Sequence, residues 1–159
     1  MSLSAKLLGQ LRAAVGQRHQ SLAIADGQRT VRCNADECDP LAATVIDLVL
    51  ETPELASATS FELQAASADL AKRVNYLMEP IAPIELDAQG CSVQMRSNPP
   101  QKDDNGRRYY ELLLRRGGSI ALCRDEKQPG QPRTRIPAVL THEVIGRLVD
   151  DFSKTVDTF

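Results

Sequence analysis

The sequence contains no tryptophan, and aromatic residues make up only 4% of its 159 positions. The core must therefore be packed mainly by Leu, Ala, Val and Ile side chains. No apolar run reaches the roughly 18–20 residues that a membrane-spanning helix needs. The N-terminal residues also lack the apolar segment and the cleavage site of a signal peptide. We therefore expect a cytoplasmic protein that does not contact a membrane.

Motifs for metal binding and catalysis are missing as well. There are only two histidines, and the four cysteines form no CxxC pair, so the usual zinc spacings do not occur. The acidic residues around Cys38 could bind a cation, but they lack the ligand positions of a calcium loop, and a solvated loop is the simpler interpretation. No phosphate-binding loop, dinucleotide fingerprint or GxSxG motif is present. The sequence predicts no cofactor, no metal and no catalytic residue.

What the chain does contain is an ordinary globular composition. Hydrophobic residues make up 42% and charged residues 25% of the sequence. A chain of this length can bury a substantial core. We expect one domain that covers residues 1–159.

Apolar residues recur at helical spacing in three segments. The first is residues 3–18, whose stripe would dock on the domain or form a dimer contact. The second is residues 60–78, where Thr59 and Glu62 match a capping box. The third is residues 138–156, with Thr141 as the expected N-cap.

Strand patterns lie between these helices. Residues 21–25 and 28–33 flank an Asp-Gly turn, and residues 83–87 and 91–96 flank a second turn, so both pairs predict hairpins. Residues 41–51 are ambiguous between helix and strand, and their β-branched residues favour a strand. The sequence predicts an α+β fold with an antiparallel twisted sheet of about six to seven strands and N-terminal, central and C-terminal helices.

Residues 91–136 differ in charge from the rest of the chain. They hold ten Lys or Arg and five Asp or Glu, which gives +5, whereas the other residues hold nine basic and sixteen acidic side chains, which gives −7. Such asymmetry can mark a surface for an anionic partner. Basic residues at strand ends also keep edges soluble, so simple solvation is the alternative.

A third hairpin lies inside this basic stretch, where two strand-like runs are joined by a Gly-Gly pair. A two-residue turn would place Glu111 opposite Arg124, on the same face as Tyr109 and Leu113. Two Pro-containing loops, residues 97–106 and 126–135, flank the hairpin. Whether they cover it is left open by the sequence.

The charge pattern suits a non-enzymatic protein-binding or adaptor domain whose partner is an acidic protein segment. An exposed strand edge would also be available for β-addition. The residues expected to contact this partner are Arg107, Tyr109, Leu113, Arg115, Arg116 and Arg124.

Two other functions compete with this hypothesis. Nucleic acid could bind the same residues, because Arg contacts phosphates and an exposed Tyr stacks on bases. The net charge of −2 and the lack of a nucleic-acid-binding fingerprint argue against it. A small-molecule enzyme or ligand carrier would need a deep pocket lined by polar groups.

The expected element order is one helix, three strands, one helix, four strands and one helix. The elements that define it are the stripe of residues 7–15, the helix of residues 60–78, the hairpin ELDAQGCSVQM and the last helix around residues 148–152. This order, together with the chain's size and acidity, resembles the type III secretion chaperone-like fold. The resemblance implies a homodimer that binds a protein segment without chemistry. The basic hairpin and its Pro-containing loops depart from that compact pattern.

Overall fold

The structure, a computed structural model, describes all 159 residues and has the α+β class expected from the sequence. Three α-helices lie near the start, in the middle and near the end of the chain, as predicted. One turn of 3-10 helix, η1, follows the third strand. The helices are α1 (Leu3–Ala13), η1 (Pro53–Leu55), α2 (Ser60–Arg73) and α3 (His142–Val156).

Ten strands form one sheet, and all of their pairings are antiparallel. Seven of them follow the order β1-β2-β3-β8-β7-β5-β4, and β6, β9 and β10 pair off this path. The strands are β1 (Arg18–Asp26), β2 (Arg29–Cys38), β3 (Ala42–Glu51), β4 (Ile81–Asp87), β5 (Ser92–Ser97), β6 (Gln101–Asp103), β7 (Gly106–Arg115), β8 (Ser119–Lys127), β9 (Thr134–Ile136) and β10 (Ala138–Thr141).

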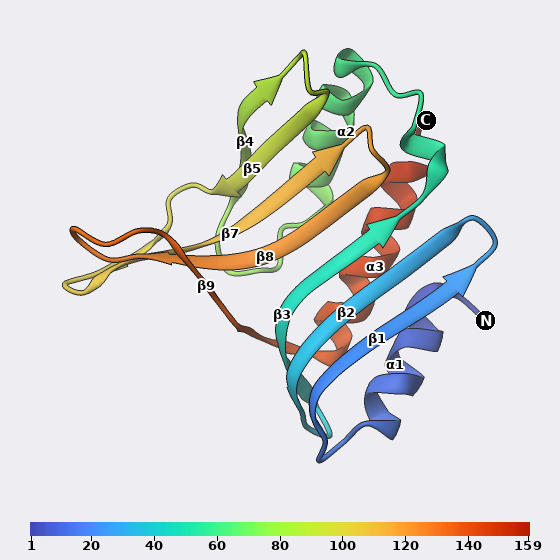
Figure 1. Cartoon of the computed structure of the whole chain (residues 1–159), viewed down its shortest axis with the longest axis vertical. Coiled ribbons are helices and arrows are strands. Elements are labelled where there is room, and N and C mark those ends of the chain that lie inside the picture. The colour runs from blue at the N-terminus through green and yellow to red at the C-terminus, as the bar shows by residue number, and fades with distance from the viewer.

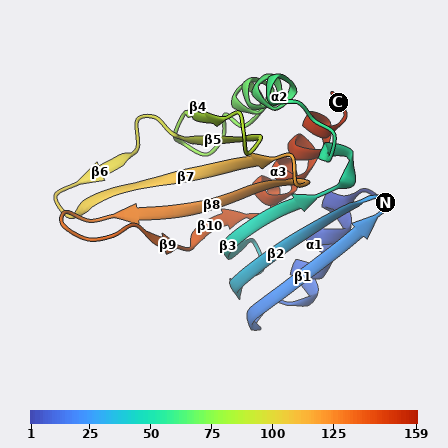
Figure 2. The ribbon, with the colours of Figure 1, turned by 45° about the horizontal axis from the view of Figure 1, so that its top comes forward.

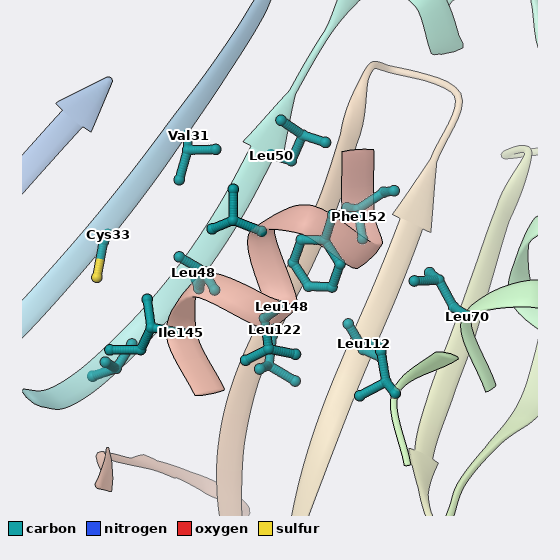
Figure 3. Packing of buried hydrophobic residues seen from close by; sticks show 14 of the residues in the cluster. Val31, Cys33, Leu48, Leu50, Leu70, Leu112, Leu122, Ile145, Leu148 and Phe152 are labelled. Carbon is teal, nitrogen blue, oxygen red and sulfur yellow. The ribbon is translucent and has the colours of Figure 1, made fainter. Parts of the chain in front are cut away.

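All three helices cover one face of the sheet and leave the other face open, as Figure 1 shows with the helices behind the strands. Alternate strand residues point under the helices and join one cluster of 36 buried residues. In Figure 3, Leu148 and Phe152 of α3 lie among Leu48 and Leu50 of β3 and Leu122 of β8. Phe152 is only 1% exposed. The centre of the core is therefore the contact of α3 with the middle of the sheet.

Two predicted helix N-caps are confirmed. The Thr59 hydroxyl accepts from the Glu62 N–H, and the Glu62 carboxylate accepts from the Thr59 N–H, each at 3.1 Å. This reciprocal capping box satisfies two amides at the start of α2. The Thr141 hydroxyl accepts from the Val144 N–H at 3.2 Å and caps α3 in the same way. These two caps determine the residues at which α2 and α3 begin.

β7 and β8 extend past the area that the helices cover. β3 pairs with β8 only over Asp47–Glu51, opposite Ser119–Cys123. Beyond this point β3 and β8 separate. β9 pairs with β8 and β10 pairs with the first half of β3, so the chain from β9 to β10 lies between the two separated strands. β6 pairs with the free part of β7. We call residues 101–109 and 124–136 the arm, and Figure 2 shows it projecting away from the helices.

The turn between β7 and β8 contains three residues, 116–118, and not the predicted two. The predicted register of this hairpin was therefore wrong by one residue. Glu111 lies opposite Cys123, and Tyr110 lies opposite Arg124. Arg124 consequently points to the face that the helices cover.

Burial of aliphatic side chains explains the observed register. Residues that face one another across a ladder share a face of the sheet. With three residues in the turn, two leucines of β7 share the covered face with an isoleucine and a leucine of β8, and all four are at most 2% exposed. The predicted register would have left the β8 pair on the open face. The four residues are Leu112, Leu114, Ile120 and Leu122.

All three helices are shorter than predicted. α1 ends at Ala13, because Gly16 has a φ of 84° and donates to the Cys38 carbonyl, which turns the chain into β1. α2 ends at Arg73, and the following segment packs on α3, where the Tyr76 hydroxyl donates to Asp151. Residues 138–141 form β10 before the last helix begins.

The predicted acidic loop around Cys38 was also wrong, because residues 33–38 belong to β2. Cys33 and Cys38 are each at most 2% exposed and face the core. Asp36 and Glu37 pair with the side chains of His19 and Arg18 on the neighbouring strand. These two acidic residues therefore form cross-strand pairs that stabilise the contact of β1 with β2.

Arg29 ties the sheet to the end of α3. Its guanidinium contacts both carboxylate oxygens of Glu54, at 2.8 and 3.0 Å, and it also donates to Asp157 at 2.6 Å and to the Ser153 carbonyl. The Arg29 hydrogen bonds lower the pKa of Glu54 to about 2, assisted by the Thr52 hydroxyl. A carboxylate whose pKa is lowered by folding stabilises the folded state above its unfolded pKa.

We expect this stabilisation to disappear as the pH falls from about 4.5 towards 2, where Glu54 takes up a proton. Because solvent screens this partly exposed pair, Glu54→Gln should lower the free energy of unfolding at neutral pH by only about 1 kcal/mol. Urea unfolding of both proteins across this pH range would measure the difference. A gap between them that stays constant down to pH 2 would contradict the assignment.

Gly118 offers a test of the three-residue turn. Its φ is 111°, and an added Cβ would lie 2.9 Å from the Thr52 carbonyl oxygen. Gly118→Ala should therefore destabilise the protein by about 1–3 kcal/mol, measured by urea unfolding. Gly117→Ala is the matched control, because nothing lies within 4 Å of the added carbon. Equal effects of the two substitutions would argue against this turn.

Candidate partner-binding surface

The residue types that usually carry catalysis are not assembled into a site. No group of three or more His, Cys, Asp or Glu side chains is placed to hold a metal ion. Burial raises the pKa of both Cys33 and Cys123 to about 12, which makes their thiols poor nucleophiles. His19 pairs with Asp36, and His142 makes no side-chain hydrogen bond. The exposed surfaces of the sheet carry most of the other residues that the sequence singled out.

Four of the six residues predicted to contact a partner share the open face of the sheet. Arg107, Tyr109, Leu113 and Arg115 are alternate residues of β7 and point away from the helices. Arg116 lies in the exposed turn that follows. The alternation predicted for β7 is thus confirmed, even though the pairing with β8 differs.

Arg124, the sixth, lies on the other side of the arm and is 8% exposed. One of its terminal nitrogens, Nη2, donates to Glu79 Oε2 and to Gln101 Oε1, both at 3.0 Å. Its guanidinium carbon lies 4.4 Å from the centre of the Tyr110 ring. Arg124 supports the underside of the arm and is not available to a partner.

Tyr109 is buried on the open face, with 4% of its surface exposed. The Arg96 guanidinium lies 4.8 Å from the centre of its ring. Arg133, from the segment before β9, reaches across to Glu111 at 2.7 Å and to Asp125 at 3.5 Å. The loop of residues 126–135 therefore covers the middle of the arm, whereas β6 lies beside β7 as an added strand.

Three basic side chains face one another at the outer end of the arm. Lys102 of β6 lies opposite Arg107 of β7, which in turn lies opposite Lys127 of β8. We call these three residues the basic row. None of them makes an ion pair, although Lys127 donates to the backbone carbonyls of Gln128 and Gln131. Like charges directly opposite one another destabilise a sheet, so repulsion within the basic row lowers the stability of the arm.

The nearby acidic residues do not relieve this repulsion. Asp103 and Glu126 both pair with Arg108, at 3.0 and 2.8 Å, on the reverse face of the arm. Arg108 lowers the pKa of Asp103 and keeps it ionised in that role. A hollow of about 330 Å³ beside the row is lined by its three residues together with Asp103, Asp104, Gly106, Gln128 and Pro129.

Apolar side chains lie further along the same face. Leu113 of β7 lies opposite Ala121 of β8, which lies opposite Val49 of β3, and all three are partly exposed. Arg115 and Arg116 follow at the end of β7, exposed and without ion pairs. The open face of β7 therefore has cations at both ends, the covered Tyr109 and Glu111 between them, and an apolar patch around Leu113 next to the Arg115 end.

Sequence reasoning missed the two lysines of the basic row. The signal was present, because Asp104 and Asn105 precede Gly106, and Asn-Gly between strand-like runs is a strong hairpin signal. That hairpin places Lys102 opposite Arg107. The ion pairs of Glu111 and Asp125 join residues that are distant in the sequence, and no local pattern predicts them.

No family model, curated protein or solved structure matches this chain. None of its three helices has the length and hydropathy of a membrane crossing.

The Arg124–Glu79 pair should behave as a buried interaction, because the two side chains are only 10% and 13% exposed. In a double-mutant cycle with Arg124→Leu and Glu79→Leu, we expect a coupling energy of about 1–3 kcal/mol, measured by urea unfolding. The control is the exposed cross-strand pair Arg32–Glu51, whose coupling should stay below about 1 kcal/mol. Equal couplings would show that the Arg124 pair is solvated.

Proposed function

We propose that this protein is a cytoplasmic, non-enzymatic protein-binding domain of the adaptor or chaperone kind. Its partner is an acidic, extended protein segment that follows β7 on the open face of the sheet and crosses over Arg96 and Arg133, which cover Tyr109 and Glu111 there. The observation that carries the proposal is the basic row, three cations directly opposite one another on a face that no helix covers.

Electrostatics support an acidic partner. Each pair of like charges placed directly opposite costs roughly 0.2–1 kcal/mol, and carboxylates from a ligand would replace that repulsion with attraction. Basic side chains outnumber acidic ones on and beside the open face of the arm. The basic residues there are Arg96, Lys102, Arg107, Lys127, Arg133 and Arg135, and the acidic ones are Asp104, Glu111 and Asp125.

The spacing of the surface supports an extended ligand. From Arg107 to Arg115 the strand advances about 26 Å, at about 3.3 Å per residue. A segment of about nine residues with acidic ends would reach both cationic ends, and apolar side chains next to the end at Arg115 would contact Leu113 and Val49. Acidic groups in such a segment would also draw it to the surface at a rate that depends on salt.

Nucleic acid is the alternative that this geometry weakens. Base stacking on a sheet needs an exposed ring, and Tyr109 is covered by Arg96 and Arg133. Phosphate contacts by the basic row remain, and the experiment below includes them as an outcome.

The test measures binding of a fluorescent peptide of about nine residues, acidic at both ends and with apolar residues next to one acidic end, by anisotropy. The variant replaces Lys102, Arg107 and Lys127 by Gln. We expect its affinity at low salt to fall at least about ten-fold, because several charge-assisted contacts are lost. Its stability should rise slightly, because the repulsion within the row is removed.

The control variant replaces Arg12, Lys72 and Lys154 by Gln. These exposed helical residues make no ion pair, so the control has the same net charge and an intact arm. It should bind the peptide like the parent. Unchanged affinity of the arm variant would refute the role of the basic row. A single-stranded oligonucleotide that binds far more tightly than the peptide, and loses affinity in the arm variant alone, would favour nucleic acid.

A further inference from the structure

β1 leaves one edge of the sheet unprotected. It pairs with β2 on one side and with no strand on the other. Native edge strands are usually guarded by proline, a bulge or charges. The opposite edge, β4, has Pro83 and an irregular register around Ile84. In β1 the run QSLAIA, residues 20–25, has none of these devices, and its ladder with β2 is regular.

A groove runs beside this edge. It has a volume of about 640 Å³ and lies between β1 and α1. Leu22 and Ile24 line it from the strand, and Gly9 and Ala13 line it from the helix. No element of the chain fills it, so both the free backbone groups of β1 and this partly apolar lining are left for an external strand.

We infer that the occupant is β1 of a second copy of this chain, paired antiparallel about a two-fold axis at Leu22. In that register Leu22 faces Leu22 of the second copy, and Gln20 faces Ile24 of the second copy. Arg18 then faces Asp26 of the second copy, and symmetry repeats this pair at the other end. Both side chains are well exposed, at 71% and 56%, and can reach a new partner.

Two features favour this register: the pairing of opposite charges and the placement of the helices on one side of the sheet. It is the symmetric pairing that joins Arg18 with Asp26, the charged residues at the two ends of the strand. Because residues opposite one another share a face, it also places the helices of both copies on the same side of one continuous sheet. The two α1 helices then become neighbours across the axis.

The outer side of α1 is suited to such a neighbour. Ala5, Gly9 and Ala13 follow one another every four residues, are exposed and present little side-chain bulk. An added Cβ on Gly9 would meet nothing within 4 Å. The buried side of the same helix, Leu3, Leu7 and Leu11, is already packed on the core. This interface lies away from the arm, so the inference does not depend on the proposed function.

The test is the oligomeric state of the full chain, measured by sedimentation equilibrium. Arg18→Asp and Asp26→Arg each place like charges opposite one another twice in the dimer. We expect each to raise the dissociation constant at least about ten-fold. The double variant restores opposite charges and should return to within about three-fold of the parent. Within one copy the two residues make only exposed ion pairs, so the monomer should stay folded.

Gly9→Arg gives a second, independent variant. It fills the groove side of α1, while Arg favours a helix more than Gly does, so the circular dichroism spectrum should be unchanged. The expected result is a folded monomer. A parent that is monomeric at every soluble concentration would overturn the inference and leave the groove to a strand of another protein. A dimer that survives all the single substitutions would overturn it as well, because it would use another surface.

Discussion

The apolar stripe of α3 packs on β3 and β8, and this contact determines where the other parts of the molecule lie. The chain reaches α3 through β9 and β10, and β10 takes the place beside the first half of β3. β8 is therefore held against β3 over only five residues before the two strands part. The rest of β8 leaves the helical layer and takes β7 and β6 with it. An open, two-sided arm follows from the way the core closes.

The arm has no helix to bury its faces, and it uses cations on aromatic rings in place of an aliphatic layer. Arg124 covers Tyr110 on one side and Arg96 covers Tyr109 on the other. The third tyrosine of the chain is covered by an arginine too, Arg147 of α3. Each guanidinium keeps hydrogen-bonding capacity at its rim while its face contacts a ring. A chain poor in aromatic residues thus places each tyrosine where a polar surface must still be packed.

Local signals in the sequence predicted the local structure well. The α+β class, the capping box at Thr59, the N-cap at Thr141 and the alternation along β7 all depend on residues within a few positions of one another. The β7–β8 register failed because a Gly-Gly pair is compatible with turns of two or three residues, and burial of Ile120 and Leu122 decides between them. The partners of Arg124 and Glu111 come from distant segments, so the accessible part of the surface needed the fold.

The short β3–β8 junction also affects the order in which the two parts of the sheet fold during synthesis. β1, β2 and β3 are neighbours in sequence, as are β4, β5, β7 and β8 along their own part of the sheet, but the junction joins residues about seventy positions apart. Closing so long a loop costs entropy and slows folding. A nascent chain would emerge from the ribosome with its N-terminal meander complete and β3 temporarily an edge. Until β8 is synthesised, the exposed edge of β3, in which seven of ten residues are apolar, can pair with a wrong strand.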